Sequence, residues 1–212
     1  MMDSYVITIG RQFGCGGREI GRLVAQQLGI AYYDKELLVE AAHASGVSAD
    51  FMAASDERAP RFFSSLWAFN PTGNNGAYFL GGSPQSDDRV YEAQSRVIVE
   101  LADRGPCVMV GRTADYVLRN HCRVVSVFVH APLDQRVQRI IERGDCAAAD
   151  EAQRMAERQN KARADYYNFY TGRHWGDAAN YDLCVNSGLL EVEGTASTIA
   201  HFARQVVTLP GR

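Results

Sequence analysis

Short runs of apolar, β-branched residues alternate along the chain with stretches whose apolar residues recur at helical spacing. Five of the short runs predict strands, at 5–9, 30–33, 107–110, 124–129 and 181–185. The helical spacing predicts helices at 18–28, 35–43, 86–104, 132–143, about 151–166 and 195–207. Because strand and helix alternate, we expect an α/β fold with about five mostly parallel strands and helices on both faces of the sheet.

Residues 56–88 interrupt this alternation. They are dense in Ser, Gly, Asn and Pro, with aromatic residues interleaved. An irregular stretch of this length in a compact domain is usually functional or mobile. Two interpretations stand at this point: a loop that covers a substrate, or a loop whose aromatics pack on the core or on a second subunit.

A glycine-rich turn, Gly10 to Gly17, follows the first predicted strand and opens into a helix. Backbone N–H groups and a helix N-terminus together make a phosphate cradle. The turn departs from the standard pattern, Gly-x-x-x-x-Gly-Lys-Ser/Thr. With Gly16 set on the second glycine, Gly17 takes the lysine position and Arg18 takes the Ser/Thr position.

Two further polar segments, Asp34 and 111–115, directly follow predicted strands. Ligands of open α/β sheets bind beyond the carboxyl ends of the strands, so we expect these segments and the turn to share one site. Two arginine-bearing helical segments also flank a predicted corner at Gly144. Phosphoryl transfer needs positive charge, a metal and exclusion of water, and this set of residues predicts such a reaction.

Composition narrows the class of protein. The chain has 212 residues, 46% of them hydrophobic, which suits one α/β domain. A net charge of −3 gives no drive onto nucleic acid or an anionic membrane. The five cysteines form no C-x-x-C pair, which indicates a reducing compartment and no structural zinc. We find no signal-peptide pattern and no apolar run of membrane-spanning length, so we predict a cytoplasmic protein.

Several segments resemble the cytidylate kinase-like family, a branch of the P-loop nucleoside monophosphate kinases. They are residues 7–20 (ITIGRQFGCGGREI), 33–37 (YDKEL), 108–118 (VMVGRTADYVL), 161–167 (KARADYY), Thr171-Gly172, Trp175 and 181–187 (YDLCVNS). The resemblance covers nearly the whole chain outside residues 60–85. It implies a three-layer sandwich in a single domain, 1–212, with 56–88 as a substrate-side loop and 143–175 as an arginine-bearing lid.

On the donor side, the resemblance implies that Gly14, Cys15, Gly16 and Gly17 wrap phosphates with their backbone N–H groups. Arg18 could supply the missing cation, with Arg11 as a second candidate, since a guanidinium offers a fork of donors. Asp34 would lie near the acceptor and the metal. A plain N-cap of the next helix is the alternative for Asp34.

On the acceptor side, Gly111 and Arg112 match the Gly-Arg of the family's Asp-Gly-Arg-Asp, which holds the acceptor phosphate. Thr113 stands where the second Asp belongs, and Asp115 is a nearby substitute. Four arginines would surround the transferring group or the acceptor when the lid closes: Arg139, Arg143, Arg158 and Arg163. Arg154 is interpreted as a surface residue.

The resulting hypothesis is ATP- and Mg²⁺-dependent phosphorylation of a nucleoside monophosphate, with CMP or dCMP favoured by the resemblance alone. Small nucleotides are the expected partners, and a homodimer is left open. Two alternatives remain: a catalytically silent nucleotide-binding regulatory protein, and a kinase for another small phosphate acceptor. The altered turn and the altered Asp-Gly-Arg-Asp favour the silent protein.

Overall fold

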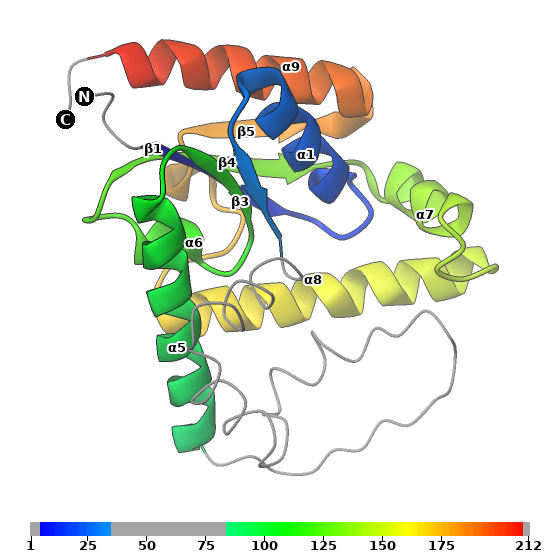
Figure 1. The fold of residues 1–212 in the computed structure, drawn as a ribbon. Helices are drawn as coiled ribbons and strands as arrows, with labels where there is room; N and C mark the ends of the chain where they lie inside the picture. Colours follow the sequence, from blue (N-terminus) through cyan, green and yellow to red (C-terminus); the bar gives the residue numbers. More distant parts are fainter. Residues whose placement is uncertain (1–4, 35–83, 210–212) are drawn as a thin grey trace.

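The computed structural model describes residues 5–34 and 84–209 (Figure 1). Five strands form one sheet, in which every neighbouring pair is parallel, in the order β2-β3-β1-β4-β5. The strands are β1 (Tyr5–Arg11), β2 (Ala31–Tyr33), β3 (Cys107–Val110), β4 (Arg123–His130) and β5 (Leu183–Asn186). The predicted α/β fold with five strands is therefore confirmed, and the sheet is wholly parallel.

Register brings the carboxyl ends of the central strands together. Ile9 of β1 lies opposite Val110 of β3 on one side and Val127 of β4 on the other. β5 begins two residues later than predicted. The Asp182 carboxylate accepts a hydrogen bond from the Ser126 N–H at 2.8 Å, where a strand carbonyl would otherwise pair. The segments that follow β1 and β3 consequently share one edge of the sheet.

One face of the sheet is covered by α1 (Gly17–Leu28) and α9 (Ser187–Thr208) (Figure 1). Their buried residues include Ile20, Val24 and Ile199, which are fully buried beside the strand residues. α1 ends at Gly29 as predicted, with a left-handed φ of 65°. A turn at 187–190 precedes the predicted start of this helix. The Asn186 side chain caps the turn by accepting from the Gly188 N–H at 2.9 Å, and Glu191, with φ 55° and ψ −171°, breaks the helical geometry between the turn and the rest of α9.

The opposite face is covered by α5 (Pro84–Asp103) and the short α6 (Ala114–Val117). Ile98 and Leu101 of α5 pack with Val6 and Met109 of the strands. α5 begins at Pro84, two residues before the predicted start at 86 and inside the segment predicted to be irregular, and proline suits the first turn of a helix. The rest of the 56–88 loop and the predicted helix 35–43 lie outside the described residues.

Helix α8 (Ala149–Thr171) runs beneath the sheet, and α7 (Leu133–Glu142) packs on its first half (Figure 1). Ile140 of α7 is buried with Met155 and Ala156 of α8. The prediction that α8 ends near Tyr166 was wrong. The helix continues to Thr171, where Gly172 supplies a left-handed cap with φ 67°, so the aromatic segment after 166 is largely helical.

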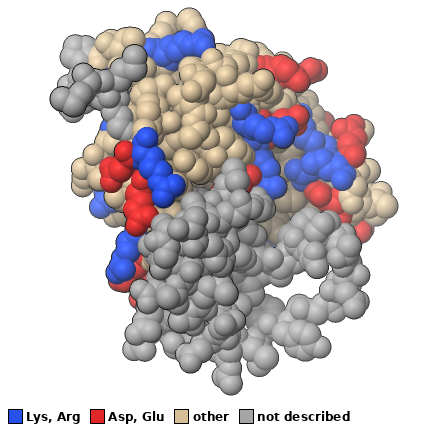
Figure 2. Space-filling view, in the orientation of Figure 1, with Lys and Arg blue, Asp and Glu red and all other residues tan. Residues whose placement is uncertain are grey.

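The surface shows no single field of one sign on the face drawn in Figure 2. Lys and Arg side chains lie beside Asp and Glu there. Within the described ranges, no helix is long and apolar enough to cross a bilayer.

Candidate active site

The loop between β1 and α1 requires its glycines. Gly14 and Gly16 have φ of 84° and 80°, in the left-handed region that side chains disfavour. A Cβ on Gly14 would lie 2.7 Å from the Arg136 carbonyl oxygen, and one on Gly17 would lie 2.7 Å from the Arg11 Cβ. The chain therefore passes closer to its neighbours here than any side chain would allow.

Side chains of α7 and α9 donate hydrogen bonds to the carbonyl oxygens of the loop. Arg136 donates to the Phe13 carbonyl at 3.4 Å, Arg139 to the Gly14 carbonyl at 3.2 Å, and the Ser187 hydroxyl to the Cys15 carbonyl at 2.8 Å. Among the described residues, the N–H groups of Gly14, Cys15 and Gly16 meet no protein acceptor. The loop thus presents donors on its outer side, which suits an anion.

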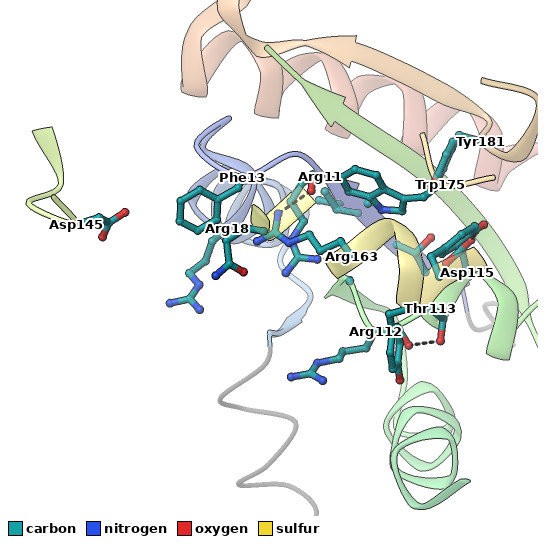
Figure 3. Close-up of a pocket in the computed structure, with 17 residues that line it drawn as sticks. Arg11, Phe13, Arg18, Arg112, Thr113, Asp115, Asp145, Arg163, Trp175 and Tyr181 are labelled. Carbon is teal, nitrogen blue, oxygen red and sulfur yellow. Dashed lines mark hydrogen bonds between the residues drawn. The ribbon is translucent and has the colours of Figure 1, made fainter. Parts of the chain in front are cut away.

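A cavity of about 430 Å³ opens beyond the carboxyl ends of β1 and β3. Figure 3 shows Arg11, Arg18 and Arg163 toward one end and Asp115 and Tyr181 toward the other. We call these the arginine end and the aromatic end. The aromatic end is lined by Asp115, Tyr166, Tyr167, Trp175 and Tyr181.

Two arginines form the floor of the arginine end. Arg163 of α8 donates from Nη1 to the Arg11 carbonyl oxygen at 2.8 Å, while its Nε is buried with no partner in the described chain. No carboxylate in the described ranges lies within ion-pair distance of Arg11 or Arg163. Burial, with repulsion from Arg112, lowers the pKa of Arg11 to about 10. Burial and repulsion from Arg11 lower the pKa of Arg163 well below its usual range.

Arg18 occupies a different environment. Its Nε lies 3.5 Å from Oδ2 of Asp34, which also accepts a hydrogen bond from the Tyr32 hydroxyl at 3.2 Å. The Arg18 side chain is 63% exposed, whereas Asp34 is buried. The cation expected to replace the loop lysine is therefore ion-paired in this structure, whereas Arg11 and Arg163 have no carboxylate within ion-pair distance among the described residues. The predicted N-cap role of Asp34 concerns residues beyond the described ranges.

Arg112 lies in a strained turn after β3. Arg112 and Thr113 have φ of 63° and 55°, and a β-branched residue in this region is an outlier. Buried Gln94 of α5 holds the turn: it donates to the Arg112 carbonyl at 3.3 Å and accepts from the Arg112 guanidinium at 3.2 Å. Sequence reasoning missed Gln94. Its signal is a lone polar residue within the apolar stripe of a helix.

The other arginines singled out in the sequence lie in different places and do not gather at one site. Arg143 pairs with Asp145, and its guanidinium carbon lies 5.3 Å from the centre of the Phe13 ring, where that of Arg163 lies at 5.5 Å. Arg139 holds the loop from behind and is absent from the described lining of the cavity. Arg158 is exposed, and Arg154 forms a surface pair with Asp150 at 2.9 Å. Cys15 is buried, and burial raises its pKa.

Comparison with known proteins assigns the chain to a family. The sequence profile of the cytidylate kinase-like family matches residues 6–189. The chain belongs to this family. The family assignment confirms the resemblance found in the sequence.

Relatives within reach of sequence comparison are cytidylate kinases. The chain is 28% identical over 116 residues to one from Pyrococcus horikoshii and 33% identical over 104 residues to one from Methanococcus aeolicus. These matches cover 55% and 48% of the chain. In each case the match spans only 57% of the relative's length.

Solved structures extend the likeness over the whole fold. An uncharacterized protein from Eubacterium ventriosum is 25% identical, with a TM-score of 0.69, and covers 94% of this chain and 98% of its own. A shikimate kinase from Bacteroides thetaiotaomicron has a TM-score of 0.51 at 13% identity, covering 97% of this chain and 99% of its own. These neighbours show that the family member has a P-loop kinase fold.

Metal ligands are sparse in this family member. Within residues 5–34 and 84–209, no three His, Cys, Asp or Glu side chains are grouped to hold a metal ion. Mg²⁺ at kinase sites is commonly held by one or two carboxylates together with substrate phosphates and waters. Asp34 beside the loop can supply one such oxygen, so the residues fit a metal that arrives with nucleotide phosphates.

Proposed function

We propose that this protein transfers a phosphoryl group from ATP, with Mg²⁺, to a nucleoside monophosphate, and that CMP or dCMP is the acceptor. One observation supports the proposal: Arg11 and Arg163 face a cavity beside a glycine loop, and no carboxylate of the described residues lies within ion-pair distance of either. Like charges that are partly withdrawn from water are costly, and a bound anion is the compensation that the cavity can accommodate.

The proposed role of each residue follows from its position in the cavity. The N–H groups of Gly14 to Gly17 would bind donor phosphates, and Arg11 and Arg163 would neutralise charge on the transferring group. Arg112, held by Gln94, would bind the acceptor phosphate. The attacking oxygen is already ionised on a phosphate acceptor, so positioning and charge are the main requirements.

Asp34 and Arg143 would act from the two rims of the cavity. Asp34 would place the metal by giving it one oxygen, which requires its contact with Arg18 to loosen, and Arg18 would then turn to the nucleotide. Arg143 lies near the Phe13 ring and would reach the donor phosphates when the corner at Gly144 closes over the loop.

A catalytically silent nucleotide-binding protein is the second candidate. The ion pair of Arg18 with Asp34 favours it, because both residues stand where the reaction needs a metal shell. A kinase for another small acceptor is the third, since the altered residues around Arg112 are those that face the acceptor.

A coupled assay of ADP release separates the three candidates. The panel holds ATP with CMP, dCMP, UMP, AMP and a non-nucleotide phosphate, and it is run with the natural protein and Arg163→Ala. We expect ADP release with CMP or dCMP and a loss of at least about a hundredfold in Arg163→Ala, as for removal of one charge-stabilising donor. ATP binding without turnover on any acceptor would establish the silent protein, and turnover unchanged in the variant would remove Arg163 from the mechanism.

A further inference from the structure

The aromatic end of the cavity has no part in holding phosphate. The rings of Tyr167 and Tyr181 lie 6.4 Å apart at 28°, and Phe128 supports Tyr181 and Trp175 with centroid distances of 5.0 and 5.1 Å. Tyr167 is buried, so its ring is fixed by packing. This end is a preformed aromatic wall of the kind that binds flat rings.

Two polar groups lie at this end. The Asp115 carboxylate accepts a hydrogen bond from the Tyr167 hydroxyl at 2.8 Å. Thr8 of β1 lines the cavity, is 3% exposed, and its hydroxyl has no partner in the described part of the chain. Buried hydroxyls without partners are rare, because each costs free energy that valine of the same shape would not. A ligand group is the partner that the cavity allows.

Charge fixes the direction in which a ligand enters. Arg11 and Arg163 attract a phosphate to one end, while the Asp115 carboxylate repels it from the other. A carboxylate only accepts hydrogen bonds, so the ring that meets Asp115 must donate them. The two ends together select a phosphate ester attached to a flat ring that bears N–H groups.

We infer that Asp115, Thr8, Trp175 and Tyr181 form the ring subsite of the phosphate acceptor and select a ring that carries an amino group. This inference rests on the proposed function and deepens it. Sequence reasoning proposed Asp115 for the acceptor side, but assigned no binding role to Thr8, Trp175 or the tyrosines.

Trp175 provides a direct readout. The chain has two tryptophans, so Trp67→Phe leaves Trp175 as the single tryptophan, which can be excited selectively over the tyrosines. CMP, UMP and ribose 5-phosphate are the probes: the first two differ in the amino group, and the third has no base. We expect CMP to change Trp175 fluorescence and to bind at least about tenfold more tightly than UMP, with ribose 5-phosphate giving no change.

Two variants test the polar groups separately. In the Trp67→Phe background, Asp115→Asn should reduce the preference for CMP over UMP in binding affinity to about twofold or less. An amide both donates and accepts hydrogen bonds, so it no longer requires a ring that donates. Thr8→Val should weaken the binding of CMP at least about threefold, because it removes the hydroxyl that would contact the ring. It should not lower the melting temperature, because that hydroxyl has no partner in the described part of the chain. Thr8→Val also provides a second test if Asp115→Asn does not fold.

The opposite results would overturn the inference. CMP binding that leaves Trp175 fluorescence unchanged, or an unchanged CMP-to-UMP ratio in Asp115→Asn, would place the ring elsewhere. Failure of the proposed function looks different: CMP would bind with the expected fluorescence change and ratio, yet no CDP would form with ATP.

Discussion

At the scale of single residues, the site depends on where a positive charge has a partner and where it has none. Arg18 and Arg143 have carboxylates, whereas Arg11 and Arg163 share a floor without one in the described ranges. Sequence reasoning named all four. It could not rank them, because ion pairing depends on which side chains the fold brings within 4 Å. Gln94 and Thr8 were missed because each lies in an apolar element that predicts only packing.

Arg163 should bind anions at a cost to the stability of the ligand-free protein. Arg163→Met should leave the melting temperature of the ligand-free protein unchanged or raise it, since it removes a buried charge repelled by Arg11. Pyrophosphate at a hundredfold excess over its dissociation constant should stabilise the natural protein by about 2.7 kcal/mol, or roughly 5–10 °C. In Arg163→Met that increase should fall to less than half.

Arg154→Met is the matched control for thermal unfolding, because Arg154 lies on the same helix in an exposed pair. It should show the full increase with pyrophosphate. A ligand-free Arg163→Met protein that melts well below the natural one, with an undiminished increase, would show that Arg163 is structural.

At the scale of elements, the loop between β1 and α1 is shaped by what surrounds it. The apolar runs predicted all five strands, and Gly29 correctly marked the end of α1. The full length of α8 was not predicted, because its end depends on the Gly172 cap rather than on apolar spacing. The turn that Asn186 caps, before the break at Glu191 in α9, was not predicted either. The support of the loop by Arg136 and Ser187 is a long-range contact that no local pattern reveals.

Two glycines with similar backbone angles test this account of the loop. Gly29→Ala should cost about 1–2 kcal/mol, the price of a left-handed alanine, because a Cβ there meets nothing within 4 Å. Gly14→Ala has φ of 84° and a Cβ that would meet the Arg136 carbonyl at 2.7 Å, so we expect a cost of at least about 3 kcal/mol. Urea unfolding gives both free energies.

Pyrophosphate binding distinguishes the glycine variants further. Gly14→Ala should lose it, since the loop must shift to admit the Cβ, whereas Gly29→Ala should retain it. Equal unfolding free energies for the two variants, with binding intact in both, would contradict the packing described for the loop.

At the scale of the whole molecule, the parallel sheet gathers distant segments at one edge. Residues 10–18, 111–115 and 163–181 meet there because β1 is central and its carboxyl end aligns with those of β3 and β4. From the general behaviour of open α/β sheets, the sequence predicted that the turn 10–17 and the segment 111–115 meet, but not that residues 163–181 join them. It could not predict the strand order, nor that the cavity has an aromatic end as well as an arginine end.

The central claim is that phosphoryl transfer occurs over Arg11 and Arg163 in place of a loop lysine. A single-turnover experiment, with enzyme in excess over γ-labelled ATP and with saturating CMP, measures that step directly. We predict labelled CDP from the natural protein and from Arg154→Met at equal rates, and a rate at least about a hundredfold lower in Arg11→Met. No labelled product from the natural protein, or an unchanged rate in Arg11→Met, would contradict the claim.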